Sequence, residues 1–266
     1  AACAGLSVFA PSTLVAALGS AAIYAGGVAL NDVADVEKDR ALHPERPLPS
    51  GAVPVAEARR GAWWLLAGGA ATALIQGPTG VPIAVATVAA VVAYDLLRGP
   101  GALAGALFLG AARGFNLLRG AAGADALEGV ALYAALFHAA LIACVTVISA
   151  HEDAPVGAPT PAEARRAARL LPAFYFGPAV LALRFGGLLA ALLAAAGGVL
   201  LAVFATRSAF EHPPRYAPIV PRAVFSLILF DALYVLVFGG PLQALAVAAL
   251  LPASLLLKRA LAQRGA

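Results

Sequence analysis

The sequence predicts an all-α protein, a polytopic transmembrane helical bundle of about nine spans. Of its 266 residues, 62% are hydrophobic and only 12% are charged, whereas soluble domains average about 25% charged residues. The apolar residues form runs of about 20, which match the hydrocarbon thickness of a bilayer. These runs are apolar all round, as is typical of helices in lipid. A soluble globular fold is therefore excluded.

Nine apolar segments follow one another along the chain. Their approximate ranges are 11–30, 60–76, 80–98, 102–119, 129–150, 168–184, 186–206, 220–238 and 241–258. None alternates with period two, as the strands of a transmembrane barrel would, and frequent glycines would let neighbouring helices approach closely. We expect residues 1–266 to form a single transmembrane domain, and residues 1–10 to be the tail of a span whose upstream part is missing.

The distribution of Lys and Arg predicts an orientation. If the segment 31–59 lies in the cytoplasm and the spans alternate, fifteen of the eighteen Lys and Arg residues lie on the cytoplasmic side. Such an excess is typical of cytoplasmic loops, and it explains the net charge of +4 without a nucleic-acid partner. We expect an integral protein of a bacterial cytoplasmic membrane, with its site opening toward the cytoplasm.

Two segments on that side, 31–59 and 151–167, begin with carboxylates directly after a span and continue with Pro and Arg. Four spans lie between them. This recurrence predicts two four-helix halves around a central cavity, each presenting an acidic helix end to the same side. The halves share no residue-by-residue repeat.

The first acidic segment places four polar side chains on one helix face. On a helix of 3.6 residues per turn, Asn31, Asp32, Asp35 and Asp39 lie within about 100° of one another. Carboxylates on one face repel one another, and a multivalent cation relieves that repulsion. Oxygen ligands favour a hard ion such as Mg²⁺, which proteins usually bind together with substrate phosphates. The pattern therefore predicts a site for Mg²⁺ and a diphosphate.

The same residues resemble a known motif. The sequence NDVADVEKD at 31–39 resembles the first aspartate-rich motif of the UbiA-type intramembrane prenyltransferases, and ERPLPSG at 45–51 resembles the continuation of that motif. Tyr94-x-x-x-Arg98 and the segment 110–116, GAARGFN, resemble further elements of the family. The second acidic segment departs from the family, because Glu152 and Asp153 have no second carboxylate four residues on. We expect one of these two residues to be a metal ligand.

The resemblance implies a Mg²⁺-dependent transfer of a prenyl group from an isoprenoid diphosphate to an aromatic or other lipophilic acceptor. The metal ligands it implies are Asn31, Asp32, Asp35, Asp39 and Glu152 or Asp153. The residues implied to bind the diphosphate are Arg46, Tyr94, Arg98 and Asn116. The residues implied in catalysis are Asp35, Asp39, Arg46, Arg98 and Arg113.

Some residues within the spans allow two interpretations. An intramembrane Arg usually faces the bundle interior and has a partner, so Arg113 either binds the diphosphate or forms a structural pair with Asp231. His138 is expected to donate an interhelical hydrogen bond. Aromatic side chains could line a prenyl tunnel, although most are expected to serve packing. They are Phe108, Phe115, Phe137 and Tyr175.

Three other functions share parts of this pattern. A non-catalytic isoprenoid- or lipid-binding protein would follow if the unusual second motif abolished the chemistry. A cation-coupled transporter would need further carboxylates near the membrane midplane, where only Asp231 qualifies. A CDP-alcohol phosphotransferase would carry a D-G-x-x-A-R element, which is absent.

Overall fold

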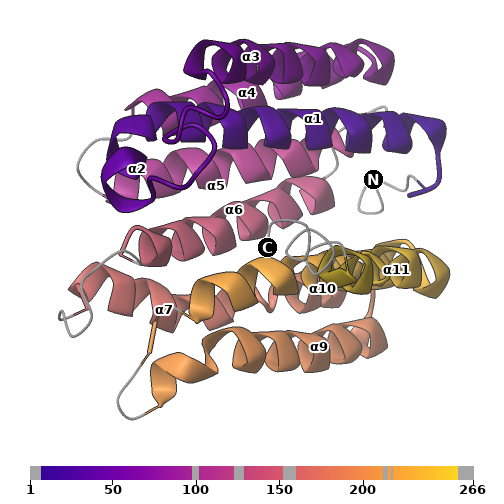
Figure 1. Cartoon of the computed structure of the whole chain (residues 1–266). Helices are drawn as coiled ribbons and strands as arrows, with labels where there is room; N and C mark the ends of the chain where they lie inside the picture. The colour runs from indigo at the N-terminus through magenta and orange to yellow at the C-terminus, as the bar shows by residue number, and fades with distance from the viewer. Residues whose placement is uncertain are drawn as a thin grey trace.

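The computed structural model describes residues 7–97, 102–122, 129–151, 160–211, 215–216 and 218–256. Within these ranges the regular structure is entirely helical (Figure 1). The helices are α1 (Pro11–Ala34), α2 (Val36–Leu42), α3 (Val55–Ala71), η2 (Thr72–Gln76), α4 (Gly80–Leu97), α5 (Ala102–Arg119), α6 (Gly129–Ser149), α7 (Ala162–Phe174), α8 (Gly177–Phe185), α9 (Leu188–Thr206), η3 (Arg207–Phe210), α10 (Ile219–Phe238) and α11 (Pro241–Ala248).

All nine predicted apolar segments are helical, which confirms the predicted fold class. Five helices among the described residues are long and apolar enough to cross a membrane: α1, α4, α6, α9 with η3, and α10. The other four segments form shorter, interrupted or more polar helices. One of them is divided into α7 and α8 at Tyr175 and Phe176, just after Pro172. Pro178, in the first turn of α8, has no N–H group to donate to the backbone oxygen of Phe174, so the helical bonding cannot run unbroken from α7 into α8.

The helices form the two predicted groups. In the first, α1 packs against α3 and α4, and α4 packs against α5; in the second, α9 packs against α8 and α10, and α6 contacts α7, α8 and α10. The two groups meet mainly where α5 packs along α6, and α11 extends the second group beside α10. Consecutive long helices run in opposite directions (Figure 1). The C-terminal ends of α1, α4, α6 and α9 therefore lie at the same end of the bundle.

Glycine permits the closest helix contacts. A Cβ atom at Gly69 of α3 would lie 2.7 Å from the backbone oxygen of Gly19 in α1, and one at Gly110 of α5 would lie 2.6 Å from that of Ala139 in α6. Real Cβ atoms do not approach backbone atoms so closely. Lipid supplies no hydrophobic drive for association, so close van der Waals contact of this kind holds membrane helices together.

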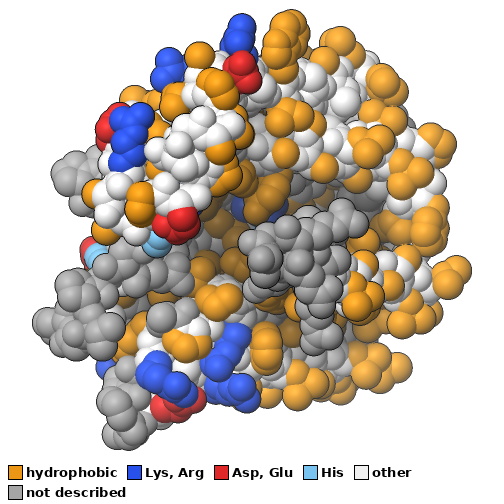
Figure 2. All heavy atoms as spheres, viewed as in Figure 1, with side chains coloured by type: hydrophobic (Ala, Val, Ile, Leu, Met, Phe, Trp, Pro, Cys, Tyr) orange, Lys and Arg blue, Asp and Glu red, His pale blue; other side chains and the backbone are white. Residues whose placement is uncertain are grey.

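Charged side chains gather at one end of the bundle. Figure 2 shows Lys, Arg, Asp and Glu at the end that carries α2 and the beginning of α7, and mostly hydrophobic side chains elsewhere on this face. The flanks carry many exposed leucines, among them Leu18, Leu189 and Leu200. A flank of this composition fits contact with lipid tails. The charged end is where both acidic segments begin.

Candidate functional site

The first acidic motif lies at the junction of α1 and α2. The helix does not continue smoothly, as the sequence had suggested, because Asp35 ends α1 with φ −93° and ψ 2° and α2 begins at Val36. The backbone bonds nevertheless carry the helical spacing across the junction: the amide of Asp35 donates to Asn31 at 2.9 Å, and that of Asp39 donates to Asp35 at 2.8 Å. The polar side chains thus stay on neighbouring turns.

The side chains of the motif interact with one another and with the following loop. The amide nitrogen of Asn31 donates a long hydrogen bond of 3.4 Å to a carboxylate oxygen of Asp35. Asp39 is buried, and its carboxylate accepts a hydrogen bond of 2.8 Å from Arg46. This hydrogen bond raises the pKa of Arg46 above its usual value. The carboxylate of Asp32 is repelled by those of Asp39 and Asp35 and attracted by the guanidinium of Arg46.

The loop after α2 fixes the position of Arg46. Within it the amide of Ser50 donates to the backbone oxygen of Arg46 at 2.9 Å, and the amide of Val53 donates to that of Pro47 at 3.1 Å. Leu48 is buried beneath the turn, and Gly51 has a φ of 79°, which glycine adopts without strain. The segment 45–51 is therefore a compact turn that returns Arg46 to the acidic helix end.

The donor atoms of this helix end suit a hard divalent cation. They are carboxylate and amide oxygens, the ligands that Mg²⁺ accepts in proteins. In the described part of the chain, however, no three acidic, His or Cys side chains converge as a ready metal cage. The Asp39 carboxylate is paired with Arg46 instead. The helix end thus fits a metal that arrives with further oxygen ligands, such as those of a phosphate.

The structure describes only some of the partners predicted for this motif. Arg98, Glu152 and Asp153 fall outside the described residues. Tyr94 is half-buried in the last turn of α4. The end of α6 is tied to the start of α7 by His151, whose Nε2 lies 2.8 Å from a Glu163 carboxylate oxygen.

A central cavity lies between the two groups of helices. One part, of about 280 Å³, is lined by α1, α5, α6 and α10, and an adjoining part, of about 240 Å³, is lined by α1, α4, α5, α6 and α10. The two parts share Ser20, Arg113, Asn116 and Leu227 in their walls and so adjoin each other along the bundle. The second part reaches Ser149, the last residue of α6, and therefore extends toward the charged end.

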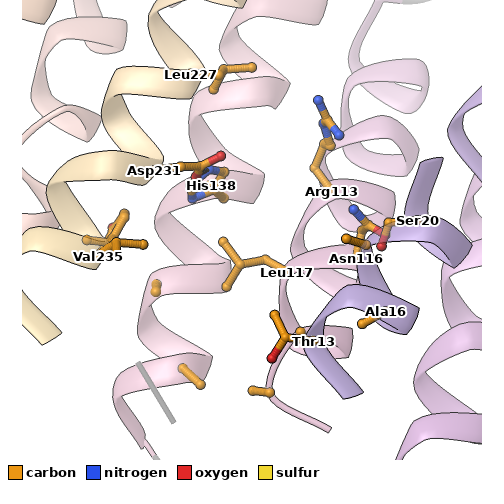
Figure 3. A pocket seen from close by; sticks show the side chains of 16 residues that line it. Thr13, Ala16, Ser20, Arg113, Asn116, Leu117, His138, Leu227, Asp231 and Val235 are labelled. Atoms are coloured by element: carbon orange, nitrogen blue, oxygen red, sulfur yellow. Dashed lines mark ion pairs between the residues drawn. The ribbon is translucent and has the colours of Figure 1, made fainter. Parts of the chain in front are cut away.

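Opposite walls of this cavity carry polar side chains. Figure 3 shows Arg113 and Asn116 from α5 on one side and His138 and Asp231 on the other. The Arg113 guanidinium lies over the Tyr24 ring, 5.6 Å from its centroid. The structural pair of Arg113 with Asp231 that the sequence allowed is not formed. Asp231 instead lies 2.7 Å from the Nε2 of His138.

The aromatic residues proposed for a prenyl tunnel do not line either part of the cavity. Tyr175, for example, is fully buried, shares a hydrogen bond of 2.6 Å with Ser226 and packs edge-on against Phe230. Tyr24 and Tyr234 are in the cavity wall instead. Which aromatic faces the cavity depends on how the helices are rotated, and uniformly apolar helices give no sequence signal for that rotation.

Two charged residues have surroundings that the sequence did not reveal. Asp95, next to Tyr94, is buried at the end of α4. Arg119 is completely buried, and donates at 2.7 Å to the backbone oxygen of Gly69 and at 3.1 Å to Gln76. It therefore joins α5 to α3 and η2. The place of Arg119 at the end of an apolar segment was the available signal, although a charge there equally suits an exposed loop.

Comparisons with known proteins agree on one family. The model described as the UbiA prenyltransferase family matches residues 1–215. Digeranylgeranylglyceryl phosphate synthase of Ignicoccus hospitalis is 50% identical over 64 residues, 24% of this chain and 21% of that protein. The enzymes of that name from Methanoculleus marisnigri and Metallosphaera sedula are 39% identical over 84 residues and 40% identical over 87 residues. They match over 32% of this chain, and over 30% and 31% of their own lengths.

A solved structure from work on digeranylgeranylglyceryl phosphate synthase in membranes shares the fold. It superposes with a TM-score of 0.58 at 19% identity, and the match covers 90% of this chain and 86% of that one. The matches to the curated relatives span less than a third of those proteins. The structural likeness therefore extends over much more of the chain than the close sequence identity does.

Proposed function

Because the chain belongs to the UbiA prenyltransferase family, we propose that it transfers a prenyl group from an isoprenoid diphosphate to a lipophilic acceptor within the membrane. The observation that carries this proposal is the acidic junction of α1 and α2, where Asn31, Asp35 and Asp39 occupy successive turns and Arg46 pairs with Asp39. A diphosphate needs both a metal ion and a cation from the protein. The carboxylate and amide oxygens of this junction would bind the metal ion, and Arg46 would be the cation.

The proposed metal ligands are Asn31, Asp32, Asp35 and Asp39, together with Glu152 or Asp153 of the second acidic segment. Mg²⁺ bound there would neutralise charge that develops on the diphosphate as its bond to the prenyl carbon breaks. The protein's own part is to hold the diphosphate at the charged end and to exclude water around the prenyl carbon. When the diphosphate binds, Arg46 would change partner from Asp39 to a diphosphate oxygen.

Further residues complete the proposed donor site. We assign Tyr94, Arg98 and Asn116 to binding of the donor, and Arg113 to stabilisation of charge inside the cavity. Arg113 and Asn116 are supported by their position in the cavity wall. The gathering of charge at one end of the bundle supports an orientation with that end toward the cytoplasm (Figure 2).

The identity of the acceptor is the next point to test. The relatives are named for the synthesis of digeranylgeranylglyceryl phosphate, so a geranylgeranylated glyceryl phosphate is the first acceptor to test. An alkylphenol is the second, because phenols are electron-rich acceptors that dissolve in membranes. Both carry a hydroxyl group at a polar end and an apolar tail.

The test uses the full chain, purified and placed in lipid nanodiscs. It is incubated with labelled geranylgeranyl diphosphate and Mg²⁺, first alone to measure binding and then with each acceptor to detect product. We expect binding that a chelator abolishes, and a prenylated product from one of the acceptors. Binding of the diphosphate without product from either acceptor would favour a lipid-binding protein over an enzyme.

A further inference from the structure

His138 and Asp231 form a polar pair inside the apolar bundle. They belong to α6 and α10, and the His138 Nε2 lies 2.7 Å from an Asp231 carboxylate oxygen. The His138 side chain is 7% exposed, whereas that of Asp231 is 47% exposed and faces the cavity (Figure 3). Ionisable residues within a membrane are costly and usually mark a functional site. In this pair the carboxylate faces the cavity and the imidazole lies behind it.

The surroundings of His138 fix its role in the pair. Its ring packs against Phe230 and Tyr234, with centroids 4.9 and 5.8 Å away, which fixes the ring orientation. Its Nδ1 is buried and has no hydrogen-bond partner. The Nε2 of His138 is therefore the ring nitrogen that meets the Asp231 carboxylate.

The opposite wall completes the charge balance. Arg113 carries one positive charge and Asp231 one negative charge, and the two face each other across the cavity without forming an ion pair. An apolar prenyl tail gains nothing from such a lining. The polar, nucleophilic end of an acceptor would be stabilised there, because its hydroxyl group can donate a hydrogen bond to the carboxylate of Asp231.

We propose that Asp231, oriented by His138, binds the hydroxyl group of the acceptor and takes its proton during prenyl transfer. This inference rests on the proposed function. The prenyl carbon–oxygen bond breaks, and its electron pair leaves with the diphosphate. An electron pair of the acceptor forms the new bond to the prenyl carbon, while the hydroxyl proton passes to an oxygen of Asp231 and later to water. His138 is a positioning residue, because it acts through Asp231.

The first test separates binding from proton transfer. Asp231→Asn keeps the size and a hydrogen-bond-accepting oxygen but removes the base. We expect it to lower the kcat of transfer by about 100-fold, as is typical for loss of a general base, with little change in the KM for the acceptor or in donor binding. His138→Ala should lower kcat as well, and His138→Gln should restore part of it through its amide N–H. Wild-type kcat in Asp231→Asn would overturn the proposal.

The second test needs no turnover. Calorimetric titration of an alkylphenol should show binding about tenfold weaker in Asp231→Leu than in the wild type, as expected for loss of a hydrogen bond to a charged group. Thr206→Val is the control, because Thr206 is a buried polar residue of α9 whose hydroxyl donates to the Ala202 oxygen of its own helix, outside the cavity. Equal binding by Asp231→Leu and the wild type, or equal weakening in the control, would refute the site. If the wild type transfers no prenyl group, the proposed function and the proton transfer both fail, and this titration alone decides whether Asp231 binds the hydroxyl group.

Discussion

Arg46 donates a hydrogen bond of 2.8 Å to the buried carboxylate of Asp39, and so joins the loop after α2 to the acidic helix end. The Asp39 side chain is 9% exposed and that of Arg46 is 49% exposed, so the pair lies at the edge of the protein with its cation accessible. In the free protein Arg46 offsets the repulsion among the carboxylates. When a metal-bound diphosphate binds, the metal ion would take the place of Arg46 at the Asp39 carboxylate. The diphosphate oxygens would then accept the hydrogen bonds of Arg46.

This relationship predicts different roles for two nearby arginines. Arg46→Ala should weaken binding of geranylgeranyl diphosphate by about tenfold or more, because charge-assisted hydrogen bonds to phosphate are strong. Arg40 is the control, since its side chain pairs with Glu37 one turn away at 2.6 Å on the exposed face of α2. Surface pairs of that kind contribute little, so Arg40→Ala should bind nearly as the wild type does. Calorimetry in nanodiscs measures both, and equal losses would contradict a specific role for Arg46.

The motif should matter more than the general charge of its segment. We expect Asp35→Asn to weaken Mg²⁺-dependent diphosphate binding by about tenfold, which corresponds to about 1.4 kcal/mol, because it removes a ligand charge. Glu57→Gln removes the same charge from the first turn of α3, outside the motif, and should have little effect. If the two substitutions weaken binding equally in the same titration, only the overall charge of this end is involved.

Metal binding should depend on the diphosphate. The described carboxylates form no ready cage and Asp39 is already paired with Arg46, while Mg²⁺ gives up its water reluctantly. We therefore expect no measurable Mg²⁺ binding by the free protein at millimolar concentration, and binding once a non-hydrolysable isoprenoid diphosphate analogue is added. Equilibrium dialysis checks this. Tight Mg²⁺ binding without the analogue would show that the protein alone completes the coordination.

Arg119 should contribute to stability and not to catalysis. Arg119→Ala leaves the buried Gln76 side chain and the backbone oxygen of Gly69 without their donor. An unsatisfied buried polar group costs about 1–3 kcal/mol, so the Tm in detergent should fall clearly. Arg184→Ala removes an Arg from the same end of the bundle, where the side chain only covers the Phe185 ring, and should leave the Tm nearly unchanged. A negligible effect of Arg119→Ala would show that water satisfies these groups.

Two adjacent glycines offer a matched test of helix packing. A Cβ atom at Gly69 would collide with the backbone of α1, whereas one at Gly68 would have nothing within 4 Å. Gly69→Ala should therefore force α1 and α3 apart and destabilise the protein by about 1–3 kcal/mol, the usual cost of overpacking. Gly68→Ala should be neutral or slightly stabilising, because alanine favours the helix. Thermal unfolding of the two variants compares them directly, and equal Tm values would contradict the close contact.

Helix membership and the acidic motif follow from local properties of the sequence. Long apolar runs such as that of α6 have to form helices in lipid, because each backbone polar group must find a partner within its own segment. The spacing of Asn31, Asp35 and Asp39 places them on successive turns in any helix. The predicted helical segments and family were therefore confirmed, whereas the metal site itself stays a prediction.

Tertiary structure alone decided which side chains meet between helices. His138 with Asp231, and Arg119 with Gln76, are pairs from separate helices, and the sequence had instead allowed Arg113 with Asp231. Helices that are apolar all round have no polar face that could fix their rotation. Their rotation is set by where small residues such as Gly69 and Gly110 allow close approach. The polar lining of the cavity follows from that packing, because each polar side chain faces wherever the rotation of its helix directs it.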